Sequence, residues 1–395
     1  MLILVFSSII FTTALSVEKN AVTVPIGVQQ NTRTSSAILS RIRHRYTVNS
    51  QLAVEPSLPA TLQGYQSGEF FVTGQIGLEL GASEDFKLFL DTGYANLWVY
   101  DKSCRTSKKK CPAKNTFDCL ASLTCRTTNE TFIIDDEGAP ANAVVYEDML
   151  CLFMDFCTNY NQKIAAALTD PTYSGLDMDG VFGASFNSLS VPMPGALKQF
   201  FEDPRCSNRL FALWMNRSAD GKNVGGEMHI CETVSTRFVG SITYAPSKAP
   251  DFWRIGVSSV TIGKTHFADS VDAMVDTGSL YMVGPSDQVA LLQQAIGATY
   301  IGGGEYQVDC NKIAQLPDLV FNIGGTDFVL KGADYAIRIV QNGNNICISG
   351  ILGMDIPPPN GPVWVLGSLF VEKFYTVFDF DNVQVGFATP IYTQH

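Results

Sequence analysis

Apolar residues along the chain gather in short runs, and one pattern of apolar run and turn occurs twice. In each copy the run ends in Asp-Thr-Gly, and an apolar-apolar-Gly segment follows much later. The segments are 88–93 (LFLDTG) with 181–183 (VFG), and 273–278 (AMVDTG) with 365–367 (VLG). From Asp to final Gly the first copy spans 92 residues (91 to 183) and the second 91 (276 to 367). The repeat predicts two similar lobes, in each of which a buried strand leads into a tight turn.

The N-terminal residues form a different kind of apolar segment. Residues 2–15 are almost all apolar or hydroxylated, and the first charged residue is Glu18. This run of 14 residues is short for a membrane span but typical of a secretory signal peptide. Ala14 and Ser16 are small residues near a cleavage point, so we predict a signal peptide over residues 1–16; the alternative is a buried helix. No later run is long enough to predict a second membrane segment.

The segment after the signal peptide, residues 17–62, differs in charge from the rest of the chain. Residues 1–65 carry five basic and two acidic residues, a net charge of +3, whereas the remainder carries −14. This contrast predicts a basic leader that docks electrostatically on an acidic body. The alternative is a basic surface helix from about Ser35 to His44. The two lobes of the body are then predicted over residues 63–245 and 246–395.

The composition narrows the class of protein. The chain has 395 residues, 46% hydrophobic and 16% charged, which predicts a large core and excludes disorder for most of its length. The net charge of −11 argues against nucleic-acid binding, and 33 glycines and 18 prolines favour turns and short strands. Ten cysteines indicate an oxidising compartment. Asn129 and Asn216 begin Asn-x-Ser/Thr sequons and are predicted glycosylation sites.

The repeated aspartates suggest a chemistry. One Asp at the end of an apolar strand is usually a turn former, and burying it is costly unless a partner compensates its charge. If the two lobes pack about a pseudo-twofold axis, Asp91 and Asp276 meet and share one proton. Such a pair can hold a water molecule, one carboxylate taking its proton while the other protonates a substrate carbonyl. The hydroxyls of Thr92 and Thr277 can form crossed hydrogen bonds beneath the pair.

At these residues the sequence closely resembles the pepsin-like aspartic proteases, over nearly the whole chain after the leader. The matching segments are 86–99 (FKLFLDTGYANLWV), 179–184 (DGVFGA), 273–285 (AMVDTGSLYMVGP) and 363–388, which includes VWVLGSLF. The resemblance implies a bilobal, almost all-β fold with a cleft between the lobes and a propeptide that blocks it. The basic stretch 35–45 would belong to that propeptide.

The resemblance also implies roles for individual residues. It makes Asp91 and Asp276 the catalytic pair and places Trp98 at the cleft. The residues that support the pair would be Thr92, Gly93, Thr277, Gly278 and Ser279. It implies two disulfides, Cys104–Cys111 in the N-terminal lobe and Cys310–Cys347 in the C-terminal lobe.

The sequence departs from the family pattern at two positions near the predicted site. Tyr94 stands where the family usually has a Ser that hydrogen-bonds the outer oxygen of the catalytic carboxylate, whereas Ser279 fills the equivalent place in the second copy. An ungapped count places Asp136 where the family has the tyrosine of the flap, so Trp98 would lack its usual partner. The alternative is a shifted loop in which Tyr146 covers the site. Losing a hydrogen bond to a charged group costs about 1.5–3 kcal/mol, so both changes predict weakened activity.

The remaining six cysteines have no family position. The local spacing of the first four allows the pairs Cys119–Cys125 and Cys151–Cys157, although four cysteines permit three connectivities. The last two, Cys206 and Cys231, could bridge neighbouring strands. The four histidines are scattered without ligand spacing, so we expect no metal site and no cofactor.

Together these observations predict an aspartic endopeptidase of the secretory pathway, either secreted or lysosomal, made as a zymogen and with weakened activity. Its substrates would be extended peptides bound in the cleft at acid pH. The alternative is a catalytically impaired relative that binds peptides or proteins. The expected partners are the substrate and the protein's own propeptide, with no nucleic acid, no membrane after removal of the signal peptide and a monomeric state.

Overall fold

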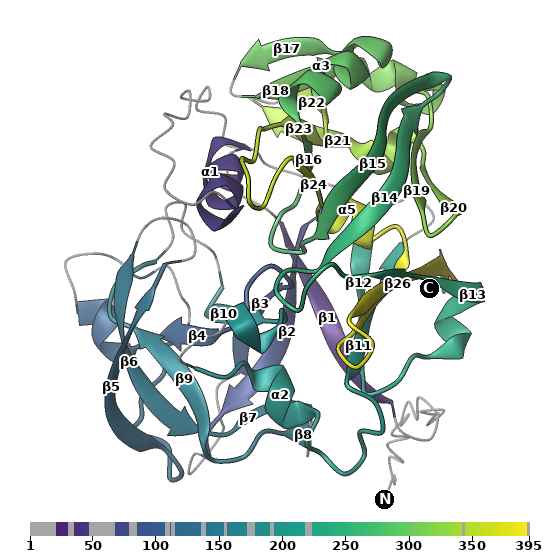
Figure 1. Ribbon diagram of the computed structural model, residues 1–395. Coiled ribbons are helices and arrows are strands. Elements are labelled where there is room, and N and C mark those ends of the chain that lie inside the picture. The colour runs from purple at the N-terminus through teal and green to yellow at the C-terminus, as the bar shows by residue number, and fades with distance from the viewer. Residues whose placement is uncertain are drawn as a thin grey trace, which may run out of the picture.

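The structure is a computed structural model. It describes residues 21–30, 35–46, 68–78, 85–106, 111, 115–135, 140–153, 156–171, 178–189, 193–217, 223–302, 304–341 and 344–392. The predicted signal peptide (1–16) therefore lies outside the described residues. Strands dominate the described part of the chain and form two lobes joined by a shared sheet (Figure 1). The predicted bilobal, mostly β fold is confirmed. No helix in these ranges is long and apolar enough to cross a bilayer.

The N-terminal lobe is built on one side of the largest sheet. In sheet order its strands are β2 (Gly68–Ile76), β3 (Asp85–Asp91), β10 (Gly180–Gly183), β4 (Leu97–Tyr100), β9 (Gln162–Ala167), β6 (Ala141–Asp148) and β5 (Arg126–Ile134). The short strand β7 (Leu150–Phe153) pairs with β2, and β8 (Phe156–Cys157) pairs with β7. The helical elements of this lobe are η1 (Lys102–Thr106), η2 (Asn187–Leu189) and α2 (Ala196–Phe200).

The C-terminal lobe contains two separate sheets. The larger has the order β20 (Thr326–Leu330), β19 (Leu319–Ile323), β14 (Arg254–Ile262), β15 (Thr265–Val275), β24 (Val363–Leu366), β16 (Met282–Gly284) and β23 (Ile351–Gly353). The smaller has the order β17 (Thr299–Gly302), β18 (Glu305–Val308), β22 (Asn344–Ser349) and β21 (Ala336–Gln341). The helical elements are η3 (Ser235–Arg237), α3 (Ser286–Ala295), η4 (Cys310–Gln315), α4 (Gly332–Tyr335) and α5 (Ser368–Val371).

The shared sheet joins distant parts of the chain. Its strands are β13 (Phe238–Pro246), β26 (Gln384–Pro390), β25 (Tyr375–Asp379), β11 (Leu210–Arg217), β12 (Asn223–Ile230) and β1 (Val22–Gln30). The leader supplies β1, which pairs antiparallel with both β12 and β2, and the last strands of the chain pair with β11 and β13. The limits predicted for the lobes stay a prediction, because this sheet draws strands from the leader and both halves.

The internal repeat corresponds to a repeated strand arrangement. In the first half β10 lies between β3 and β4, parallel to β3 and antiparallel to β4. In the second half β24 lies between β15 and β16 in the same two orientations. Both β3 and β15 end in fully buried residues after a partly exposed start, so each strand enters the interior where its Asp-Thr-Gly begins.

An aromatic cluster packs the lobes together. Trp253, which follows the shared sheet, packs against two rings. Its ring centroid lies 4.1 Å from that of Phe186, in the N-terminal half, and 5.2 Å from that of Phe378 of β25, which it meets edge-on. The indole Nε1 of Trp253 donates a hydrogen bond of 3.1 Å to the carbonyl oxygen of Ala184. Because Ala184 follows the Gly of the first apolar-apolar-Gly segment, this contact ties the second lobe to the loop beside Asp91.

All ten cysteines form disulfides. The two pairs implied by the resemblance, Cys104–Cys111 and Cys310–Cys347, are present. The pairs Cys119–Cys125, Cys151–Cys157 and Cys206–Cys231 are present as well, which selects one of the three connectivities that the sequence left open.

Candidate active site

The two Asp-Thr-Gly loops meet where the lobes join. Asp91 is the last residue of β3, and Asp276 directly follows β15. Their side chains are buried, with 0% and 1% of their surface exposed. The amide of Gly93 donates to Asp91 Oδ1 at 2.9 Å, and the amide of Gly278 donates to Asp276 Oδ1 at 2.8 Å. Each carboxylate is therefore held by the glycine two residues further along its own loop.

The same two glycines let the loops approach each other. A Cβ atom at Gly93 would lie 2.6 Å from Asp276 Oδ1, and one at Gly278 would lie 2.5 Å from Asp91 Oδ1. Real Cβ atoms do not approach other atoms this closely, so any side chain at either position would push the loops apart. The structure thus brings Asp91 and Asp276 together, as the repeat predicts.

Crossed hydrogen bonds from the two threonines support the loops from below. The hydroxyl of Thr92 donates to the carbonyl oxygen of Val275 at 2.9 Å, and the hydroxyl of Thr277 donates to that of Leu90 at 2.7 Å. The amide of each threonine donates to the hydroxyl of the other, at 3.0 and 2.9 Å. These four buried bonds fix the positions of the two aspartates relative to each other.

We expect Thr277→Val to lower the free energy of unfolding by about 2–4 kcal/mol, because it leaves the Thr92 amide and the Leu90 carbonyl buried without partners. Thr277→Ser should recover most of the loss. Thr326→Val, which removes an exposed hydroxyl bonded to Thr243, is the matched control. The free energy of unfolding of the three variants is measured by chemical denaturation followed by tryptophan fluorescence. Equal losses in Thr277→Val and Thr326→Val would contradict a stabilising role of the Thr277 hydroxyl.

The leader places an arginine between the two aspartates. Helix α1 (Ser35–Tyr46) lies between the lobes (Figure 1). Arg45 Nη1 donates to Asp91 Oδ1 at 3.0 Å and to the two oxygens of Asp276 at 3.2 and 3.3 Å, and Nη2 donates to Asp91 Oδ2 at 2.8 Å. A single guanidinium group therefore pairs with both carboxylates.

Two further residues of α1 reach the same loops. Arg41 is 2% exposed; its Nη2 pairs with Asp91 Oδ2, and its Nη1 donates to the carbonyl oxygen of Gly278 at 3.1 Å. Tyr46 is 1% exposed, and its hydroxyl donates to Asp276 Oδ2 at 2.9 Å. Arg41 and Arg45 of the leader thus pair with the acidic body, as electrostatic docking predicts. The helix of the alternative is present, but the face that carries these two arginines is buried and not on the surface.

Burial and charge act in opposite directions on these groups. Burial raises the pKa of Asp276 above its ordinary value; Arg45 opposes this, and the charge of Asp91 adds to it. Burial, followed by the charge of Asp276, raises the pKa of Tyr46 well above that of an exposed tyrosine. Tyr46 therefore stays a hydrogen-bond donor, and Asp276 binds a proton more readily than an exposed aspartate does.

An apolar surface of the C-terminal lobe receives the other side of α1. Tyr46 packs edge-on against Phe252 with ring centroids 4.9 Å apart. Leu39 and Ile42 are buried in the same apolar cluster, which belongs mainly to the C-terminal lobe. Its other buried members are Met274, Leu280, Tyr281, Val283, Ile337, Ile339, Ile348, Leu352, Met354, Ile356, Val363, Val365 and Leu369.

Ser279 does not have the hydrogen bond that the resemblance implies. Its hydroxyl donates to the carbonyl oxygen of Tyr281 at 3.0 Å, and the outer oxygen of Asp276 accepts from Tyr46 instead. Tyr94, which replaces the corresponding Ser after Asp91, packs at the edge of an apolar cluster of the N-terminal lobe. With the leader bound, groups of α1 therefore supply the hydrogen bonds to the outer carboxylate oxygens.

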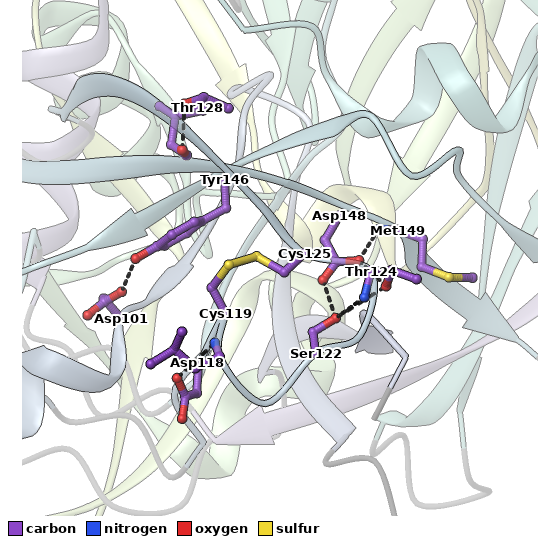
Figure 2. Close-up of a disulfide and its surroundings, with 12 residues drawn as sticks. Asp101, Asp118, Cys119, Ser122, Thr124, Cys125, Thr128, Tyr146, Asp148 and Met149 are labelled. Atoms are coloured by element: carbon purple, nitrogen blue, oxygen red, sulfur yellow. Dashed lines mark hydrogen bonds between the residues drawn. A yellow bond between two sulfur atoms is a disulfide. The ribbon is translucent and has the colours of Figure 1, made fainter. Parts of the chain in front are cut away.

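The flap region is the hairpin of β5 and β6. Asp136, predicted at its tip, lies outside the described residues. Trp98 is fully buried, and its Nε1 has no hydrogen-bond partner among the described residues. Because Asp136 is not one of these residues, the loss of a flap partner stays a prediction. Tyr146 points toward Asp101 and donates to Asp101 Oδ2 at 3.3 Å (Figure 2), which does not support the alternative in which it covers the aspartates.

The two predicted glycosylation residues differ in exposure. Asn129 is exposed on β5, whereas Asn216 lies within β11 and is only 4% exposed. A glycan on Asn216 would have to displace the packing around this strand, so its burial argues against that site. Asn129 stays a prediction.

The sequence reasoning missed the residues of α1 that contact the aspartates. The signal was present, because Arg41 and Arg45 are four residues apart and therefore share one face of a helix. It also missed β1, although Val22, Val24 and Ile26 alternate with other residues in the period of a strand.

The arrangement is suited to acid–base chemistry on a water molecule, because two rigidly held carboxylates share one site. The family described as eukaryotic aspartyl protease matches residues 73–390 of the chain. Aspartic protease 3 of Caenorhabditis elegans is 38% identical over 336 residues, which are 83% of this chain and 84% of that protein. Cathepsin D of Homo sapiens is 30% identical over 359 residues, 87% of this chain and 86% of that protein.

Solved structures agree on the fold. The crystal structure of an aspartic proteinase from Irpex lacteus superposes with a TM-score of 0.71 at 21% identity and covers 94% of this chain and 98% of the other. With the matching family description, the similar relatives and the paired Asp-Thr-Gly loops, the chain belongs to the eukaryotic aspartyl protease family.

Proposed function

We propose that the protein is an aspartic endopeptidase of the secretory pathway, made as a zymogen, in which Asp91 and Asp276 activate a water molecule. The observation that carries the proposal is the contact of one leader arginine, Arg45, with both carboxylates. A guanidinium group at this position excludes the water molecule and the substrate carbonyl that hydrolysis requires. Both catalytic carboxyl groups are therefore in place, and the leader prevents substrate from reaching them.

The chemistry follows from one proton shared by the two carboxylates. The proton belongs to the pair of carboxyls and not to one aspartate. The ionised carboxylate of Asp91 and Asp276 takes a proton from the water, the water oxygen bonds to the carbonyl carbon of the peptide, and the protonated carboxyl gives its proton to the carbonyl oxygen. Collapse of the tetrahedral species moves the proton taken from the water to the leaving nitrogen, returns a hydroxyl proton to the other carboxylate and breaks the C–N bond.

The leader also indicates the substrate class. Leu39, Ile42 and Tyr46 fill an apolar surface of the C-terminal lobe, which removal of the leader would open. We infer that extended peptides with large apolar side chains near the scissile bond occupy this surface. Five disulfides, the predicted signal peptide and the similarity to cathepsin D support a location in the secretory pathway, either extracellular or lysosomal.

Acid is the expected trigger for leader release. Protonation of the two carboxyls leaves Arg41 and Arg45 buried without counter-charges, which is costly. Burial of Asp276 acts in the opposite direction, because it favours the neutral carboxyl in the docked state. We infer that the loss of counter-charges for Arg41 and Arg45 has the larger effect. We therefore infer that α1 stays docked near neutral pH and leaves as the pH falls toward about 4.

The test is to shift the full chain from neutral pH to about pH 4 with a denatured protein as substrate, and to follow both by mass spectrometry. We expect the leader to be lost, with the new N-terminus between about residues 50 and 65, and substrate fragments to appear only afterwards. An intact leader at pH 4 would contradict the zymogen proposal. Loss of the leader without hydrolysis would favour the second candidate function, a peptide-binding relative.

Two altered positions favour that second candidate, namely Tyr94 and Asp136. If each has lost a hydrogen bond to a charged group, the double variant Tyr94→Ser with Asp136→Tyr should raise the rate of hydrolysis by roughly 10²- to 10⁴-fold. The measurement is kcat/KM for a peptide substrate after removal of the leader. An unchanged rate would show that the ungapped alignment of the flap is wrong.

A further inference from the structure

A small disulfide loop of the N-terminal lobe has an inverted distribution of polar and apolar side chains. The loop, residues 119–125, is closed by the Cys119–Cys125 disulfide. Its polar residues turn inward: Ser122 Oγ donates to Asp148 Oδ2 at 2.7 Å, and Thr124 Oγ1 donates to Asp148 Oδ1 at 2.6 Å (Figure 2). Asp148 is fully buried at the end of β6. These bonds and the disulfide fix the conformation of the loop.

The apolar residues of the loop point the other way, into solvent. Leu120 is 96% exposed and Leu123 is 60% exposed. Leu78, from the segment after β2, is 52% exposed, and its carbonyl oxygen accepts a hydrogen bond of 2.8 Å from the amide of Leu123. Three exposed leucines therefore lie on the loop or on the segment bonded to it, and we call these three residues the leucine patch. Single exposed leucines are common, but a rigid loop that buries its hydroxyls and exposes its leucines indicates a binding surface.

The sequence on either side of the disulfide loop is basic although the protein is acidic. Between Lys102 and Arg126 the sequence has seven basic residues and one acidic residue, a local net charge of +6 in a chain of −11. Among the described residues, Arg126 is exposed at the start of β5, and the side chain of Lys102 is 67% exposed. Lys102 pairs with Asp118, the one acidic residue of the segment. The backbone bond from Lys102 N to Phe117 O places the Lys102 segment beside the disulfide loop.

We propose that the leucine patch, together with Lys102 and Arg126, is a docking site for the surface of an anionic lipid membrane. Apolar side chains that project from a rigid loop can enter the region between headgroups and acyl chains, and neighbouring lysine and arginine side chains attract anionic headgroups. The two kinds of side chain would act together, since the leucines bury apolar surface and the basic residues attract the anionic headgroups. The leucines favour a membrane over a soluble polyanion, because a polyanion offers no apolar layer to bury them.

This proposal revises the expectation of no membrane contact after removal of the signal peptide. That expectation rested on the absence of a second long apolar segment, which excludes crossing a bilayer but not lying on one. The patch belongs to the N-terminal lobe and contains none of the residues assigned to hydrolysis. Membrane docking and peptide hydrolysis can therefore fail or succeed independently.

The test is co-sedimentation of the full chain with vesicles of phosphatidylcholine alone and with about one third phosphatidylserine. We expect the wild type to bind the anionic vesicles more tightly, and binding to weaken as the salt concentration rises. Leu120→Ser combined with Leu123→Ser should reduce the affinity at least about tenfold. Leu291→Ser, at a leucine of α3 that is 56% exposed on the other lobe, is the matched control and should change nothing.

The contribution of the basic side chains is tested with a second pair of substitutions. Lys102→Gln with Arg126→Gln should lower the affinity severalfold, whereas Arg209→Gln with Lys331→Gln, at exposed positions elsewhere, should not. Absence of binding to the anionic vesicles would overturn the proposal. Binding that the leucine variant leaves unchanged, and that heparin abolishes, would also overturn it, because the surface would then recognise a soluble polyanion through charge alone.

Discussion

Asp276→Asn is expected to reduce the rate of peptide hydrolysis at acid pH by at least about 10³-fold. The amide cannot give up a proton to the substrate carbonyl as the protonated carboxyl does, and it cannot share a proton with Asp91. The fold should be unaffected, because the amide oxygen can still accept the 2.8 Å hydrogen bond from the amide of Gly278. The rate is measured as kcat/KM on a peptide with apolar residues at the cleaved bond.

The leader of Asp276→Asn has to be removed by another protease, because an inactive variant cannot cleave its own leader. Trace amounts of tagged, active wild-type protein can remove the leader and then be withdrawn through the tag. Asp272→Asn, four residues earlier in β15 and paired with Lys248, is the matched control and should retain nearly full activity. Hydrolysis by Asp276→Asn at the rate of this control would show that the carboxyl pair is not the catalytic centre.

Arg45→Ala is expected to loosen the leader strongly at neutral pH. Removing one partner of a buried ion pair costs about 3–5 kcal/mol, and here one guanidinium group pairs with two carboxylates. The docked population of α1 should therefore fall by roughly 10²–10³-fold relative to the undocked one. Hydrogen exchange of the amides of residues 35–46, measured by mass spectrometry at neutral pH, should become faster by a similar factor.

The effect of Arg45→Ala should depend on pH in a defined direction. Because the pKa of Asp276 is raised, this carboxyl becomes neutral at a higher pH than an ordinary aspartate does. Once it is neutral it no longer attracts Arg45, so the difference between variant and wild type should be full near neutral pH and shrink as the pH falls toward about 4. The control is Arg209→Ala, an exposed arginine paired with Asp381. A difference that grows on acidification would contradict the ion-pair account.

The predictable part of the site is the part that the sequence repeats. Two Asp-Thr-Gly segments with matched partners suffice to place Asp91, Asp276 and the two threonines, because a repeat about a pseudo-twofold axis leaves little freedom for the loops. The need for glycine at positions 93 and 278 follows from the close approach of the two loops, because a Cβ atom at either position would clash with the carboxylate of the opposite loop. Disulfides between cysteines that are close in sequence, such as Cys119–Cys125, can also be predicted from the local spacing.

Other features depend on contacts between segments that are far apart in sequence. The Ser279 hydroxyl donates within its own loop, and the hydroxyl of Tyr46, 230 residues before Asp276 in the sequence, donates to Asp276 instead. The strand β1 pairs with the edges of β12 and β2, and these two edges come together only when the lobes have folded. Asn216 has an intact sequon, and only its place in the middle of the shared sheet makes it buried.

The most direct test of the shared-proton pair is the dependence of kcat/KM on pH for the protein after its leader has been removed. One ionised and one protonated carboxyl predict a bell-shaped profile with its maximum in the acid range, at about pH 3–5, and loss of activity near neutral pH. A rate that stays constant or rises from acid to neutral pH would contradict a mechanism in which Asp91 and Asp276 share one proton.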